Sequence, residues 1–174
     1  MGYVRHIISI VVLVVIPLFS IGCGDFSDEA KLGDDRATFE KTYKKELRQD
    51  QRYLARSLIY SDDVTVGVTF DPQLGDRVEH IEIASKGGEF SELDDFLPND
   101  KREIEQADEE MLKEINRVID EFFVCEKLVF YESKELQGKI GRARFSVAKL
   151  SVKTTKNYVY VVSTKPDEIL LINP

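Results

Sequence analysis

Strict alternation of apolar and polar residues marks a strand early in the folded part of the chain. In residues 64–70 apolar side chains occupy the even positions, and small or polar residues occupy the odd ones. This period of two is typical of a strand with one buried face. Residues 71–76 contain Asp, Pro and Gly, which favour a turn, and residues 78–84 can return as a second strand. The pattern predicts an antiparallel hairpin.

Two other stretches repeat apolar residues at the spacing of a helix. The first spans about residues 36–60, and its apolar residues fit one helical face. The second begins near Asp100 and Glu103, which are arranged like a capping box, and its apolar stripe continues to Phe122. We expect these stretches to be the two main helices of the protein.

The C-terminal part of the chain has the pattern of a β-meander. Strands are predicted at residues 127–132, 140–153, 158–164 and 168–172, because turn-prone residues separate these apolar stretches. Together with the hairpin they give an antiparallel sheet of about six strands. The sequence therefore predicts an α+β fold in which the two main helices pack on one face of this sheet.

The first residues have the three parts of an export signal. A short segment with Arg5 precedes an apolar run at residues 7–16, and Gly22 stands directly before Cys23. The residues 20–23, Ser-Ile-Gly-Cys, resemble the lipobox of bacterial lipoproteins, although that family usually has Leu where this chain has Ser20. The resemblance implies that Cys23 receives a lipid of the palmitate type, becomes the mature N-terminus and anchors the protein to a bacterial membrane.

Two alternatives to lipidation stay open on this evidence: an uncleaved signal anchor, and secretion after an ordinary cleavage. All three place the folded part outside the cytoplasm. The expected organisation is a signal peptide at residues 1–22, an acidic tether at residues 23–35 and a single α+β domain at residues 36–174. A chain of 174 residues has room for one domain of ordinary size.

The charge of the chain bears on its partners. Its formal net charge is -8 at pH 7. An acidic surface repels nucleic-acid phosphates and anionic lipid headgroups, so we expect no nucleic-acid partner and no membrane contact except through the N-terminal lipid. A protein of the cell envelope remains a possible partner.

Residues suited to catalysis or metal binding are few. The predicted mature chain has one histidine, His80, and one cysteine besides Cys23, namely Cys125. Multi-histidine metal centres and glycine-rich phosphate loops are both missing from the sequence, so no metal, cofactor or catalytic residue is assigned. A small envelope hydrolase that uses carboxylates, or Cys125 with His80, is the alternative function.

The preferred function is a membrane-anchored, non-enzymatic binding or assembly module of the cell envelope. Its candidate binding surface combines cations with aromatic rings on two late strands. Arg142 and Arg144 lie on one of these predicted strands, and Tyr158 and Tyr160 alternate on the next. We expect these four residues to form a mixed surface on the open face of the sheet.

Overall fold

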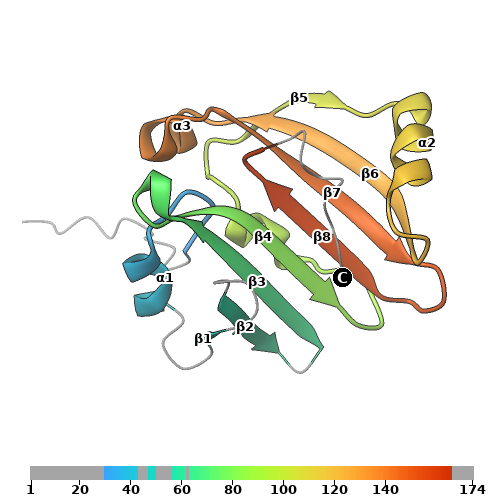
Figure 1. Ribbon diagram of the computed structural model, residues 1–174, viewed down its shortest axis with the longest axis horizontal. Helices are drawn as coiled ribbons and strands as arrows, with labels where there is room; N and C mark the ends of the chain where they lie inside the picture. Colours follow the sequence, from blue (N-terminus) through green and yellow to red (C-terminus); the bar gives the residue numbers. More distant parts are fainter. Residues whose placement is uncertain (1–29, 43–46, 50–55, 62, 166–174) are drawn as a thin grey trace, which may run out of the picture.

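A computed structural model describes residues 30–42, 47–49, 56–61 and 63–165 of the chain (Figure 1). These residues form one antiparallel sheet of eight strands, in the order β1-β2-β3-β4-β8-β7-β6-β5. The α+β class and the antiparallel sheet are confirmed, and the described sheet has more strands than the six expected. The strands are β1 (Leu47–Gln49), β2 (Arg56–Ser61), β3 (Val64–Asp71), β4 (Arg77–Ser85), β5 (Arg102–Gln106), β6 (Phe123–Glu132), β7 (Arg144–Val152) and β8 (Tyr158–Ser163).

The strand order divides the sheet into two consecutive meanders. Strands β1 to β4 follow one another in the sheet, as do β5 to β8, and the pairing of β4 with β8 joins the two halves. The β3–β4 pair is the hairpin predicted from the alternating pattern, and its turn is the 3-10 helix η1 (Pro72–Leu74). The strands predicted at residues 127–132, 140–153 and 158–164 correspond to β6, β7 and β8.

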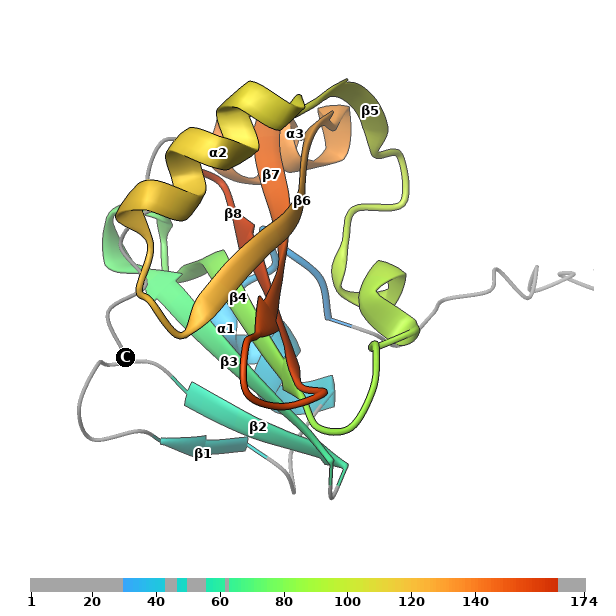
Figure 2. The same ribbon diagram turned by 90° about the vertical axis from the view of Figure 1, so that its right-hand side faces the viewer.

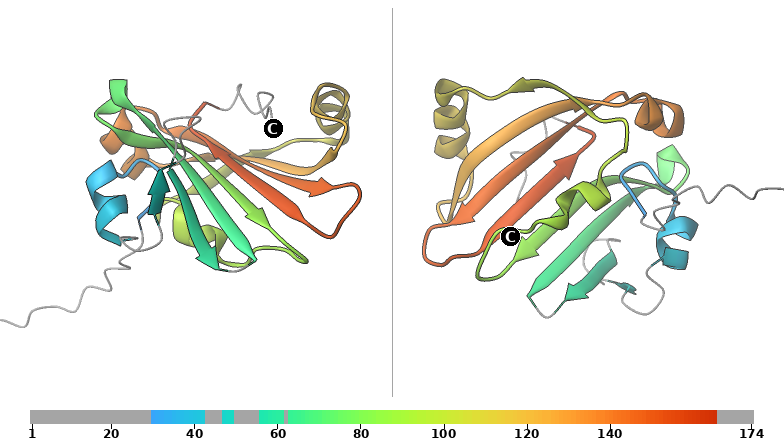
Figure 3. Two further views of the ribbon diagram at one scale, coloured as in Figure 1. Left: turned by 60° about the horizontal axis from the view of Figure 1, so that its bottom comes forward. Right: turned by 180° about the vertical axis from the view of Figure 1, so that it is seen from behind.

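The larger core lies on one face of the sheet, which we call the α3 face. Strand residues Val66, Ile81, Phe145 and Val162 on this face belong to one buried cluster. Three short helices close that cluster: α1 (Arg36–Thr42) with Phe39, the 3-10 helix η2 (Glu92–Phe96) with Phe96, and α3 (Lys134–Ile140) with Leu136 and Ile140. From behind, η2 and its flanking chain cross in front of the sheet (Figure 3, right).

The opposite face, which we call the α2 face, has a smaller core. Ala148, Leu150 and Val161 on this face cluster with Cys125 and with Ile115 of α2 (Glu109–Val118). Figure 2 shows α2 and η2 on opposite sides of the sheet. The predicted packing of the helices on one face is therefore not confirmed, because α2 covers the face opposite to α1 and α3.

The two long predicted helices are both wrong in extent. The first ends at Thr42, and Leu47–Gln49 and Arg56–Ser61 are strands that continue the meander by pairing toward β3. In the second, the segment after Asp100 forms edge strand β5, and α2 begins only after Asp108, whose carboxylate accepts a hydrogen bond from the Met111 backbone N–H at 2.8 Å. In both places, pairing with the next strand along the chain has overridden a local helical pattern.

The start of the fold lies earlier than predicted. Leu32 is completely buried in the larger core, and its backbone N–H donates to the Phe96 carbonyl at 2.9 Å. The Gly33 N–H donates to the Val78 carbonyl at 3.0 Å. Residues 30–35 of the predicted tether thus belong to the folded unit, which corrects its expected start at residue 36.

Some of the predicted features lie outside the described residues. These are the signal peptide at residues 1–22, Cys23 with the first part of the tether, and the strand at residues 168–172. Within the described ranges, none of the helices has the length and apolar character needed to cross a membrane.

A candidate ligand cavity at one end of the sheet

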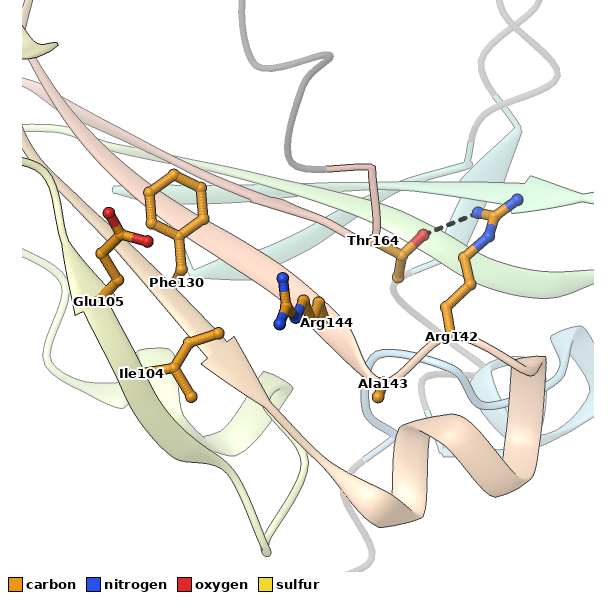
Figure 4. Close-up of a pocket in the computed structure, with 7 residues that line it drawn as sticks. All are labelled: Ile104, Glu105, Phe130, Arg142, Ala143, Arg144 and Thr164. Carbon is orange, nitrogen blue, oxygen red and sulfur yellow. Dashed lines mark hydrogen bonds between the residues drawn. The ribbon is translucent and has the colours of Figure 1, made fainter.

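The candidate site is a cavity of about 590 Å³ where β5, β6, the start of β7 and the end of β8 meet. Its volume is within the range of small-molecule sites, about 300–1,000 Å³. Figure 4 shows its walls, with Ile104, Phe130 and the Glu105 carboxylate on one side and Thr164 and Arg142 on the other. The lining residues are Ile104, Glu105, Phe130, Arg142, Ala143, Arg144 and Thr164.

The apolar wall is made by Ile104 and Phe130. Phe130 is half-buried and packs against the smaller core, which fixes the position of its ring. Ile104 lies at an irregularity in the β5–β6 pairing, between Glu103 and Glu105. Its side chain is 39% exposed, although branched aliphatic side chains of this size are usually buried. The cavity therefore offers apolar surface that water contacts in the free protein.

Arg142 belongs to a polar network behind the opposite wall. Its Nη1 atom donates to the Thr164 hydroxyl at 3.1 Å and lies 3.5 Å from the Glu79 carboxylate. That carboxylate also lies 3.1 Å from the Lys165 ammonium. One carboxylate thus faces two cations at this corner of the cavity.

Arg144 occupies the middle of the cavity. Figure 4 shows it between the Ile104–Phe130 wall and Thr164. Its cross-strand neighbour is Glu132, but the Glu132 carboxylate pairs instead with Arg102, at 2.7 Å. Within the part of the chain that the structure describes, the exposed Arg144 guanidinium makes no ion pair. It is therefore available to an anion entering the cavity.

A buried serine adjoins this site on the α2 face. Ser146 follows Arg144 by two residues on the same strand, so both side chains face the same way. Its cross-strand partners are Phe130 and Ser163. The Ser146 hydroxyl is fully buried and has no hydrogen-bond partner among the described residues. Such groups are uncommon in native folds, where most buried polar atoms are paired.

The structure divides the predicted binding surface into two separate pairs. Arg142 and Arg144 line the cavity on the α2 face, whereas Tyr158 and Tyr160 point to the α3 face. Tyr160 is buried, and its hydroxyl accepts a hydrogen bond from the Phe90 N–H at 3.2 Å. The four residues do not share one surface, because the two strands present these pairs on opposite faces.

The tyrosines adjoin a cation of their own. The Lys149 ammonium lies 4.6 Å from the centre of the Tyr158 ring and pairs with the carboxylates of Glu89 and Glu126, at 2.7 and 3.2 Å. The hydrogen bond that the Lys149 ammonium donates to Glu89 is the main cause that raises the pKa of Lys149 above its ordinary value. Two carboxylates outweigh the single positive charge of Lys149, so this cluster attracts an anion less than Arg144 does.

Cys125 and His80 are not brought together. Strands β8 and β7 separate β4 from β6, which places these two residues at least about 14 Å apart across the sheet. The Cys125 side chain is 2% exposed, and burial raises the pKa of its thiol. A thiol of this kind is protonated at neutral pH and a poor nucleophile. Among the described residues, no group of three or more His, Cys, Asp or Glu is arranged to hold a metal ion.

Sequence reasoning missed Ile104, Phe130 and Thr164 as site residues. The sequence pattern places Ile104 on a helix, whereas it lies in β5; Phe130 lies near the end of β6, and Thr164 directly follows β8. Comparison with known proteins adds no further candidates, because no family model, curated protein or solved structure matches this chain.

Proposed function

We propose that this protein is a lipid-anchored component of a bacterial envelope, attached through Cys23, and that its folded part is a non-enzymatic binding module. The export signal and the lipobox-like residues before Cys23 support the anchoring. The cavity supports the binding role, because an apolar wall stands beside an arginine without an ion-pair partner among the described residues. That juxtaposition is the observation that carries the proposal.

The alternative hydrolase has less support. Its thiol version needs Cys125 and His80 in contact, and these residues lie on strands that are not neighbours. Its carboxylate version needs two acids facing a substrate, whereas Glu105 is the single acid that lines the cavity among the described residues. Binding without chemistry therefore fits the cavity better than hydrolysis does.

Anchoring is tested by metabolic labelling with an alkyne analogue of palmitate in a bacterial host. We expect the full chain to be labelled and to fractionate with membranes. Cys23→Ala should abolish the label and leave the precursor uncleaved, whereas the matched control Cys125→Ala should keep both. Label retained in Cys23→Ala would refute lipidation at this residue. A membrane-bound chain without label would instead indicate a signal anchor, and release into the medium would indicate ordinary secretion.

Binding is tested by native mass spectrometry of the full chain extracted from bacterial membranes. We expect a non-covalent mass in addition to the lipid. Ile104→Trp enlarges a side chain that points into the cavity (Figure 4) and should remove that mass, whereas the matched control Val118→Trp, at an exposed position of α2, should retain it. Circular dichroism and thermal unfolding identify any variant that is misfolded. A preparation with no bound mass, or a mass retained in a folded Ile104→Trp, would contradict the proposal.

A further inference from the structure

We infer that the ligand is a small amphipathic carboxylate: its anionic group pairs with Arg144, and its apolar body lies against Ile104 and Phe130. This inference rests on the proposed function, since it names the chemistry of the ligand that the cavity takes. Charge, donor geometry and the position of the apolar wall each support it.

The charge around the cavity favours a group with a single negative charge. Arg144 is the cation that no described carboxylate neutralises, and Arg142 shares Glu79 with Lys165. Glu105 adds a negative charge to the lining. A phosphate monoester carries nearly two charges at neutral pH, and its second charge would find no second unpaired cation among the described lining residues and would face Glu105. The balance of charges therefore selects a carboxylate.

The donors are arranged to hold a flat anion. A guanidinium presents its N–H groups in a planar fork that matches the two oxygens of a carboxylate. On the neighbouring strand end, the Thr164 hydroxyl accepts a hydrogen bond from Arg142 and keeps its own proton for donation. Thr164 is buried, and the contacts of Arg142 with Thr164 and Glu79 hold the Thr164 oxygen in place before a ligand arrives.

The apolar wall indicates that the ligand has an apolar body besides its carboxylate. Ile104 and Phe130 lie across the cavity from Thr164, with Arg144 between them (Figure 4). A ligand that paired only with Arg144 would leave both apolar side chains in water. An alkyl or aryl body attached to the carboxylate covers them, and the burial of this surface adds affinity that a simple anion such as acetate lacks.

The test uses isothermal titration calorimetry of the purified protein with decanoate, decanol and decyl phosphate, all below their aggregation concentrations. We expect decanoate to bind about tenfold more tightly than either of the other probes, because a charge-assisted hydrogen-bonded pair is gained without excess charge. Arg144→Gln should weaken decanoate about tenfold and leave decanol unchanged, and Arg144→Lys should recover part of the loss. The matched control Arg117→Gln, on the exposed surface of α2, should bind decanoate like the wild type.

Ile104→Ser tests the contact between the apolar body of the ligand and the apolar wall. It should weaken decanoate and decanol by the same factor, since both carry the same alkyl chain. Equal binding of decanoate and decanol, with no effect of Arg144→Gln, would overturn the carboxylate inference but leave a binding cavity intact. Tighter binding of decyl phosphate would overturn the charge argument. If no probe binds although native mass spectrometry detects a cavity-dependent mass, the ligand class is wrong and the proposed function stands.

Discussion

Substitution of Gly33 by alanine tests whether the start of the chain packs as described. Gly33 has φ of +87°, a left-handed conformation that residues with a Cβ adopt at a cost. A Cβ built on it would lie 2.7 Å from Cδ1 of Leu136 in α3. Leu136 is completely buried, so its side chain has little room to move away. Gly33→Ala should therefore force residues 30–35 and α3 apart.

The expected magnitude has two parts. The left-handed conformation costs about 1–2 kcal/mol for a residue with a Cβ. Insertion of a methyl group into a packed core adds about 1–3 kcal/mol. We therefore expect Gly33→Ala to lower the free energy of unfolding by about 3 kcal/mol. Gly75→Ala is the matched control, because Gly75 has a similar φ of +73° but no atom within 4 Å of the added Cβ. It should cost only about 1 kcal/mol.

The assay is urea unfolding followed by circular dichroism, completed by a double-mutant cycle with Leu136→Ala. The single Leu136→Ala change should cost about 3 kcal/mol through the cavity it leaves. In the double variant the methyl group added at position 33 occupies part of that cavity, so the combined cost should be at least about 1 kcal/mol smaller than the sum. Equal losses for Gly33→Ala and Gly75→Ala, together with additive behaviour in the cycle, would refute the packing of this segment against α3.

Further predictions concern single contacts. Asp100 accepts hydrogen bonds from Ser133 Oγ and from the N–H groups of Lys134 and Glu135, which lower its pKa. The ionised carboxylate stabilises the fold above about pH 4, and this stabilisation is lost as the pH falls through the lowered pKa. In Asp100→Asn the free energy of unfolding should therefore fall less steeply below about pH 4 than in the wild type, and an equally steep fall would contradict this. Asn116→Ala, which removes bonds of 2.7 and 3.1 Å to the Cys125 backbone, should cost about 1–3 kcal/mol in urea unfolding. Ser146→Ala should raise the free energy of unfolding by about 1 kcal/mol, and a loss would reveal a hydrogen bond of this hydroxyl. Alkylation of Cys125 by iodoacetamide, followed by peptide mass spectrometry, should be roughly 100-fold slower in the native than in the unfolded protein.

Strand β7 illustrates how far local pattern determines the fold. Its apolar residues change sides along the strand, with Phe145 and Val147 in one core and Ala148 and Leu150 in the other. The sequence alone suggests a bulge near Ala148 that would keep both sets buried. In the structure β7 pairs continuously with β8 there, and the register shift on its other side lies in β6, between Cys125 and Lys127. Both sets of apolar residues are buried because α2 covers the second face. Alternation predicts a strand well, but whether both of its faces are covered depends on elements distant in the sequence.

The missed strands follow from the same limit. β2 pairs with β3, and β5 pairs with β6, so each is stabilised by hydrogen bonds to another segment rather than by its own spacing of apolar residues. In isolation, residues 36–60 and 100–122 fit a helical stripe, and this local preference is weak compared with sheet formation.

The candidate site was predictable only in part. The sequence predicts Arg142 and Arg144 as binding residues, because they are closely spaced cations before a stretch rich in apolar residues. Their cavity partners Ile104 and Phe130 lie far from them in the sequence and reach the site through the shifted register of β5 on β6. Tyr158 and Tyr160 seemed to be partners of the arginines, but side chains on the two faces of a sheet cannot meet.

The most direct test of the ligand cavity is mapping of amide chemical shifts by NMR while decanoate is added to the isotopically labelled protein. We predict saturable shifts centred on Phe130, Ala143, Arg144 and Thr164, which surround the cavity. The amide shifts of Lys149 and Tyr158, which lie in the lysine–glutamate cluster on the other face, should stay unchanged. Saturable shifts centred on Lys149 and Tyr158, or no saturable shift near Arg144, would contradict binding in this cavity.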